Sequence, residues 1–294
     1  MNNEQLGSKD QMVEERAPVV HSVLHLTDFS IESEIAFAHA LAIATLRKAD
    51  LTILHVGKQN FSGDDWQQFP SAEIILKRWG LLEEDSIPMD IEKHFGFKIQ
   101  RVDLTHDNVA QASIGYLKSH PNDVLVLSTE GRSGPSKWLK PSIAEKLSNK
   151  LRSKTLFIPH KADPFIDLDS GKITINRILV PVDHFPSPHE VVEYAVRAAT
   201  MTAQKSVEII LLHISDGRGF PQLDLPKHSN IQWTKIERKG SVVDKIIKTA
   251  DQESVDLIIM ATRGTNGILD ALRGSVTRQV LSQARCPVYS VPST

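Results

Sequence analysis

Short apolar runs alternate with amphipathic segments along most of the chain. Apolar spacings of three and four, as in 31–47, predict helices, whereas runs of five or six mostly apolar residues predict buried strands. The predicted strands are the apolar run 21–28, which ends in Asp28, and 51–56, 98–103, 123–128 and 154–159, then the run 176–183, which ends in Asp183, and 209–214, 232–236, 256–261 and 286–291. The predicted helices are 31–47, 108–119 and 142–151, then 191–202, 241–252 and 275–283. Continuously apolar strands that alternate with helices indicate a mostly parallel sheet covered on both faces.

The same succession of elements occurs twice. Asp28 closes the first apolar run and Asp183 closes its counterpart, 155 positions later. The spacing is 158 between His55 and His213, and it drops to 133 by the last helix of each half. The drop locates an insert in the first half, 57–95, with a helix predicted over 71–79. The fold class is therefore α/β, with two tandem units that each contain an open, twisted, five-stranded parallel sheet of Rossmann-like type.

Composition shifts place the boundaries. We expect a polar, loose tail over 1–17, a first domain over 18–160, a Pro-, Asp- and Gly-containing linker over 161–173, and a second domain over 174–294. Two domains also suit a length of 294 residues.

Charge and cysteine content exclude several classes of protein. The formal net charge of −2 leaves no basic field for a nucleic-acid backbone, and no apolar run approaches a membrane span. A single cysteine, Cys286, excludes an internal disulfide framework and a cysteine-built zinc site. The polar N-terminus lacks the apolar stretch of a signal peptide, so we expect a cytoplasmic protein.

A glycine-containing loop after the fourth strand of the second half is the main candidate for ligand chemistry. Gly264, Gly267 and Gly274 precede a helix that is predicted to begin near Ser275. Glycines let a backbone approach a phosphate, N–H groups at a helix start point at it, and the Ser275 and Thr277 hydroxyls add donors. The alternative interpretation is that these are turn glycines and that Ser275 is an N-cap.

These residues carry a resemblance. The pattern Gly-x-x-Gly, nine residues, Gly-Ser is typical of nucleotide-binding universal stress proteins, in which an Asp closes the first strand. Here the nine-residue spacer separates Gly264 from Gly274, and Ala261 takes the place of the first glycine. Asp28-Phe29-Ser30, the Leu-His endings at His55 and His213, and 285–288 agree with the same family. The chain thus resembles a tandem universal stress protein over both halves.

The resemblance implies that ATP, with or without Mg²⁺, binds once per chain, chiefly in the second half. Pro181, Val182 and Asp183 are then expected at the adenosine end, and Ile214 and Met260 around the adenine. The residues expected around the ribose and phosphates are Ala261, Gly264, Gly274, Ser275, Val276 and Thr277. The first half departs further: Pro141, which has no N–H for a phosphate, stands where the second half has Gly274, and Glu130 adds negative charge. We expect its site to be impaired.

Three functions remain in competition. The first is a nucleotide-binding regulator of the stress response with regulatory protein partners. The second is an interaction module without nucleotide, whose halves pair as an intramolecular pseudo-dimer through 155–158 and 288–291 and which could also form a homodimer. The third, an adenylyl-transferring enzyme, is disfavoured because neither a P-loop nor Gly-x-Gly-x-x-Gly occurs. We assign no catalytic residue and no metal site, since His184 and His189 lack zinc-like spacing, and we expect His55 and His213 to be structural.

Overall fold

The computed structural model describes residues 21–57, 63–129, 153–160, 162–202, 204–215, 217–262 and 276–292. The first half contributes β1 (Ser22–Thr27), α1 (Ile31–Arg47), β2 (Asp50–Gly57), α2 (Gly63–Gln68), α3 (Ala72–Arg78), α4 (Pro88–Phe95), β3 (Ile99–Thr105), α5 (Val109–Ser119), β4 (Val124–Thr129) and β5 (Lys154–Pro159). The second contributes β6 (Arg177–Val182), α7 (His189–Ala199), β7 (Val207–Ile214), β8 (Ile231–Arg238), α8 (Val242–Gln252), β9 (Leu257–Thr262), α9 (Val276–Leu281) and β10 (Val288–Pro292).

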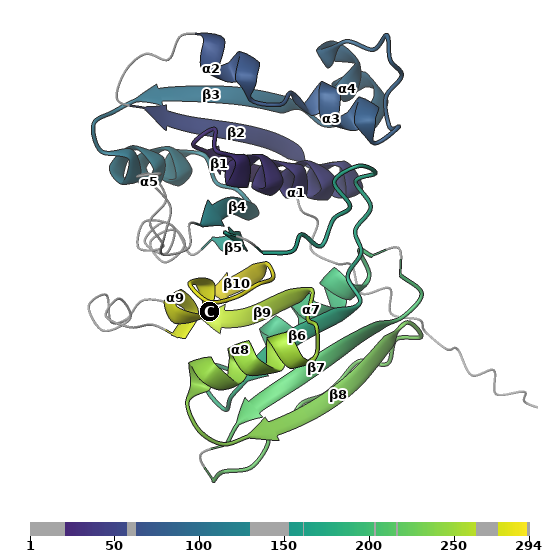
Figure 1. Ribbon diagram of the computed structural model, residues 1–294, viewed down its shortest axis with the longest axis vertical. Helices are drawn as coiled ribbons and strands as arrows, with labels where there is room; N and C mark the ends of the chain where they lie inside the picture. Colours follow the sequence, from purple (N-terminus) through teal and green to yellow (C-terminus); the bar gives the residue numbers. More distant parts are fainter. Residues whose placement is uncertain are drawn as a thin grey trace, which may run out of the picture.

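These strands form one continuous sheet in the order β3-β2-β1-β4-β5-β10-β9-β6-β7-β8 (Figure 1). Within each half all pairs are parallel, which confirms the predicted fold class. The halves meet where β5 and β10 pair antiparallel, with Leu156 opposite Tyr289. The expected pairing of the two last strands is therefore present, and it joins both sheets into a single layer.

Local signals explain where α1 begins and ends. The Ser30 hydroxyl accepts a hydrogen bond from the Ser33 N–H at 3.2 Å and so caps the helix. Glu32 and Glu34 lie in the first turn and Arg47 in the last, where each charge complements the helix dipole. The predicted helix over 31–47 is thus confirmed with the same bounds.

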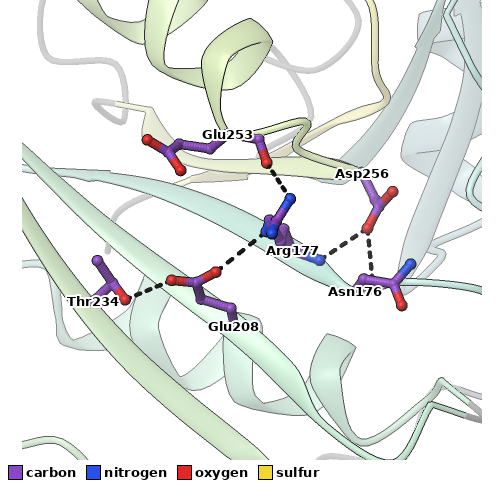
Figure 2. A network of polar contacts seen from close by, with 6 residues as sticks. All are labelled: Asn176, Arg177, Glu208, Thr234, Glu253 and Asp256. Carbon is purple, nitrogen blue, oxygen red and sulfur yellow. Dashed lines mark hydrogen bonds and ion pairs between the residues drawn. The ribbon is translucent and has the colours of Figure 1, made fainter.

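One carboxylate clamps the amino-terminal edge of the sheet in each half. Asp256 Oδ2 accepts from the backbone N–H groups of Asn176 and Arg177 at 2.6 and 2.8 Å, and so ties the start of β6 to the start of β9 (Figure 2). Arg177 also pairs with Glu208 on β7 at 3.2 Å. In the first half, Asp123 Oδ2 accepts in the same way from the N–H groups of residues 21 and 22, at 2.9 and 3.0 Å.

The insert and the linker pack against each other. The predicted helix over 71–79 is present as α3, and α2 and α4 add helices that the apolar spacing did not predict. Phe165, Ile166 and Ile173 of the linker are buried, and the Trp79 indole N–H donates to the Leu168 carbonyl at 3.0 Å. The linker is therefore part of the core of the first half. The predicted tail over 1–17 and the predicted helix over 142–151 lie outside the described residues.

Candidate functional site

A cleft opens at the carboxyl ends of β6 and β9, where the strand order reverses. The two strands pair at Ile178–Leu257 and Leu179–Ile258 and then separate. Pro181, two residues further along β6, has no backbone N–H with which to continue the ladder. Open α/β sheets bind ligands in such a crevice, and this one has a volume of about 650 Å³, partly open to solvent.

All of the predicted site residues that the structure describes line this cleft. Eight of its lining residues belong to that set: Pro181, Val182, Asp183, Ile214, Met260, Ala261, Val276 and Thr277. Gly264, Gly274 and Ser275 lie outside the described residues. The proposed roles of these side chains toward a nucleotide remain predictions, but their convergence from four elements on one cleft is an observation.

Further lining residues escaped the sequence analysis. Pro186, Pro188 and Val191 come from the segment after Asp183 and the first turn of α7, and Val242 and Ile246 come from α8. The apolar stripe of α8 is visible in the sequence, but the stripe alone does not say which of its members reaches the end of the sheet. The lining of the cleft is therefore mostly apolar, with residues from β6, β7, β9, α8 and the first turn of α7.

Asp183 provides the charge in the cleft. Among the described lining residues it is the one ionisable side chain, and it is about half exposed. Its Oδ1 accepts a hydrogen bond from the His184 N–H at 2.7 Å, and the Arg218 guanidinium lies 3.9 Å away. Its outer lone pairs face solvent at the mouth, where they can accept hydrogen bonds from a ligand.

The histidines that end the second strand of each half have a structural role. His213 Nδ1 lies 3.1 Å from the Val182 carbonyl, and His55 Nδ1 lies 3.0 Å from the Thr27 carbonyl. Each ring thus tethers neighbouring strands at the carboxyl edge. Both histidines are buried.

Metal and thiol chemistry find little support in the described part of the chain. No three His, Cys, Asp or Glu side chains cluster there in a way that could hold an ion. Cys286 is buried, and burial together with the nearby Asp256 and Asp251 raises the pKa of its thiol to about 12. A thiol in that state is a poor nucleophile. No helix among the described residues is long and apolar enough to cross a membrane.

The corresponding edge of the first half is built differently. Asp28 Oδ1 accepts from both the backbone N–H and the hydroxyl of Ser30, the residue that caps α1. Phe29 has a left-handed backbone (φ 61°), and its ring stacks on His55 with 4.3 Å between centroids. Trp66 and Phe69, from the insert, meet Phe29 edge-on. Aromatic rings therefore cover this edge on the α1 face.

Comparison with known proteins gives a consistent result for both halves. The model of the universal stress protein family matches residues 20–159 and again 174–292. A universal stress protein of Methanothermobacter thermautotrophicus is 31% identical over 107 residues, which cover 36% of this chain and 66% of that protein. One of Methanocaldococcus jannaschii is 25% identical over 144 residues, 42% of this chain and 85% of that protein. This chain thus spans just under two thirds of the length of the first relative.

Solved structures agree on the fold. A universal stress protein from Archaeoglobus fulgidus aligns over 93% of this chain and 98% of its own, with a TM-score of 0.59 and 18% identity. A protein of unknown function from Pseudomonas aeruginosa aligns over 93% of both chains, with a TM-score of 0.60 and 14% identity. At these identities the likeness concerns the fold alone.

Proposed function

The chain belongs to the universal stress protein family, and from this premise we propose that its second half binds an adenine nucleotide. The proposed ligand is ATP, with or without Mg²⁺, at one site per chain. Binding stabilises the state that it selects and thereby regulates partner proteins in the cytoplasmic stress response. The single observation that carries the proposal is the convergence of eight residues of the expected site on one cleft.

The lining of the cleft matches the chemistry of an adenosine. Ile214, Ile246 and Met260 offer apolar surface against which a purine ring can pack. Asp183 at the mouth can accept hydrogen bonds from the adenosine end of the ligand. Ala261 and Val276 also line the cleft, and in this proposal they contact the ribose, with the Ala261 methyl narrowing the approach.

The phosphate half of the proposal rests on the sequence. Gly264, Gly274 and Ser275 follow the spacing of the family's nucleotide-binding motif. The near-zero net charge of the chain supplies no general attraction for phosphate, so affinity must come from local backbone N–H groups and hydroxyls.

We propose a regulator without catalytic activity. General acid–base and nucleophilic catalysis use at least two groups in mutual reach, such as a nucleophile and its base. Asp183 is the one ionisable side chain among the described lining residues, and its ion-pair partner Arg218, 3.9 Å away, stays protonated and so serves neither as a nucleophile nor as a base. The second candidate function, an interaction module without nucleotide, is favoured by the alanine at position 261, which departs from the family motif.

Calorimetric titration of the full chain with ATP tests the proposal. We expect saturable binding near one ATP per chain, lost in Gly274→Pro, which gives the second half the proline of the first. The matched control is Pro141→Gly, which should leave that binding intact, and circular dichroism should show both variants folded. Absence of binding in the wild type, or equal binding by Gly274→Pro, contradicts the site and favours the interaction module. ATP hydrolysis that falls in Ser275→Ala contradicts the assignment as a non-enzyme.

A further inference from the structure

A second cavity lies where the two halves meet, and none of its residues lines the carboxyl-end cleft. Its floor is the sheet on both sides of the β5–β10 seam, including Leu156, Ile259 and Tyr289. Helices α1 and α7 flank it, one from each half (Figure 1). Phe165 of the linker and Ile175, just before β6, complete the wall. We call this space of about 810 Å³, partly open to solvent, the junction cavity.

Three cations line this largely apolar space. Arg197 of α7 is paired with Glu193 at 3.2 Å. Arg47 of α1 and Lys154 of β5 have no carboxylate partner within the described part of the chain. The Arg47 Nε is buried and has no hydrogen-bond partner there. A half-buried guanidinium without an acceptor is costly, because the protein does not replace the water that it lost.

The carboxylate in the cavity wall is already engaged. Asp123 Oδ2 accepts from the N–H groups of residues 21 and 22 and from the Ser22 hydroxyl, at 2.9, 3.0 and 3.1 Å. These bonds clamp β1 to β4 and hold the carboxylate at the amino edge. Asp123 therefore does not serve as the hydrogen-bonded partner of Arg47 or Lys154.

Two tyrosines frame the cations. The Arg197 guanidinium and the Lys154 ammonium lie over the Tyr194 ring, 4.8 and 5.2 Å from its centroid. The Tyr289 hydroxyl makes no hydrogen bond to another described residue. Burial and the neighbouring Tyr194 raise the Tyr289 pKa, so this phenol stays a neutral donor. Burial and the charge of Arg197 lower the pKa of Arg47, and the anion of the cavity wall, Asp123, adds to the raised pKa of Tyr289.

We propose that the junction cavity binds a small amphipathic carboxylate. The apolar body rests on the sheet at Leu156 and Ile259, and the carboxylate takes hydrogen bonds from Arg47, Lys154 and the Tyr289 hydroxyl. The alternative explanation is that Arg47, in the last turn of α1, only complements the negative end of the helix dipole. This explanation covers Arg47 and no other residue of the cavity. It does not account for Lys154, which lies on the sheet with its ammonium over the Tyr194 ring, or for the Tyr289 hydroxyl.

Titration of the full chain with sodium octanoate tests the proposal. We expect saturable calorimetric binding, with acetate and 1-octanol at least about tenfold weaker because each lacks one half of the ligand. Arg47→Gln and Lys154→Gln should each weaken octanoate binding about tenfold, whereas Arg47→Lys, which keeps the charge, should lose less. The matched control is Lys118→Gln, an exposed charge change on α5 that should leave the affinity unchanged.

Several outcomes overturn the proposal. If octanoate does not bind the wild-type protein saturably, the junction cavity does not bind an amphipathic carboxylate. If Arg47→Gln and Lys154→Gln bind octanoate as tightly as the wild type does, or if the wild type binds 1-octanol as tightly as octanoate, the cations do not hold a carboxylate. Displacement of octanoate by ATP places it in the carboxyl-end cleft instead. Because the proposal uses no residue of that cleft, failure of ATP binding does not affect it.

Discussion

The carboxyl edges of the two halves differ although their topology is the same. Strands β1 and β4 pair at four successive positions, whereas β6 and β9 pair at two and then separate. The amino edges, by contrast, carry the same clamp, with Asp123 in one half and Asp256 in the other. The two copies therefore keep what holds the strands together and diverge at the edge where ligands bind in such sheets.

Side chains at matched positions sharpen this contrast. Val182, Ile246 and Ala261 line the cleft of the second half, and the first half has Thr27, Ser113 and Ser128 at the corresponding places. The Ser113 hydroxyl is buried and has no hydrogen-bond partner among the described residues. The first half keeps apolar residues, Val56 and Leu127, where the second has Ile214 and Met260, so the two edges differ in polarity at the three positions above.

Acid should destabilise the first half before the second, and we expect this effect to be the largest. Burial lowers the pKa of His25 and of His39 from 6.5 to about 4, whereas the second half has Val180 and Tyr194 at these positions. Above pH 6.5 these histidines are neutral in both states. As the pH falls from 6.5 towards 4, the unfolded chain takes up protons that the folded chain does not. The free energy of unfolding should fall by about 2 kcal/mol per histidine at about pH 5.

Urea unfolding at about pH 7.5 and about pH 5 measures this loss, and hydrogen exchange locates it. Exchange should rise first in β1–β5. His39→Leu should remove about half of the pH dependence, since it replaces one of the two titrating rings. Equal acid-induced exchange in β6–β10, or an undiminished loss in the leucine variant, argues that the asymmetry of the buried histidines does not control acid stability.

The amino-edge clamps should be equivalent in energy. Asp123→Ala and Asp256→Ala each leave two backbone N–H groups without their carboxylate acceptor. We expect each change to lower the free energy of unfolding by about 2 kcal/mol in urea denaturation. Asp251→Ala, an exposed change on α8, is the control and should cost less than about 0.5 kcal/mol. A clamp that matters in only one half would refute the equivalence of the two edges.

The sequence predicts the repeated elements well because their signals are local. The apolar stripe over 31–47 places α1 correctly, and the structure adds the cap at Ser30. The insert is harder: α2 reads Gly-Asp-Asp-Trp-Gln-Gln and has no apolar stripe, so its helix depends on tertiary contacts of Trp66. The burial of Phe165 likewise depends on tertiary packing, since its ring meets the His39 ring of α1 edge-on.

The candidate site divides in the same way. Asp183, Ile214 and Met260 were expected because the resemblance to the family implies them, and they do line the cleft. Ile246 was not expected, since its position depends on how α8 crosses the sheet. The junction cavity was beyond the reach of any local pattern. It arises only when β5 and β10, more than a hundred residues apart in the chain, pair across the seam.

Restoring the motif glycine should produce the smallest effect and the most direct comparison of the halves. Ala261→Gly removes the methyl group that lines the cleft, so a ribose or phosphate can approach the backbone more closely. We expect ATP affinity to rise about threefold to tenfold by calorimetry, against a loss of stability of about 0.5–1 kcal/mol from glycine in a strand. Ser128→Gly is the matched change in the first half and should create no second ATP site, because Pro141 still offers no N–H. Unchanged affinity in Ala261→Gly would mean that the methyl group does not limit binding, and a second site in Ser128→Gly would mean that Pro141 does not disable the first half.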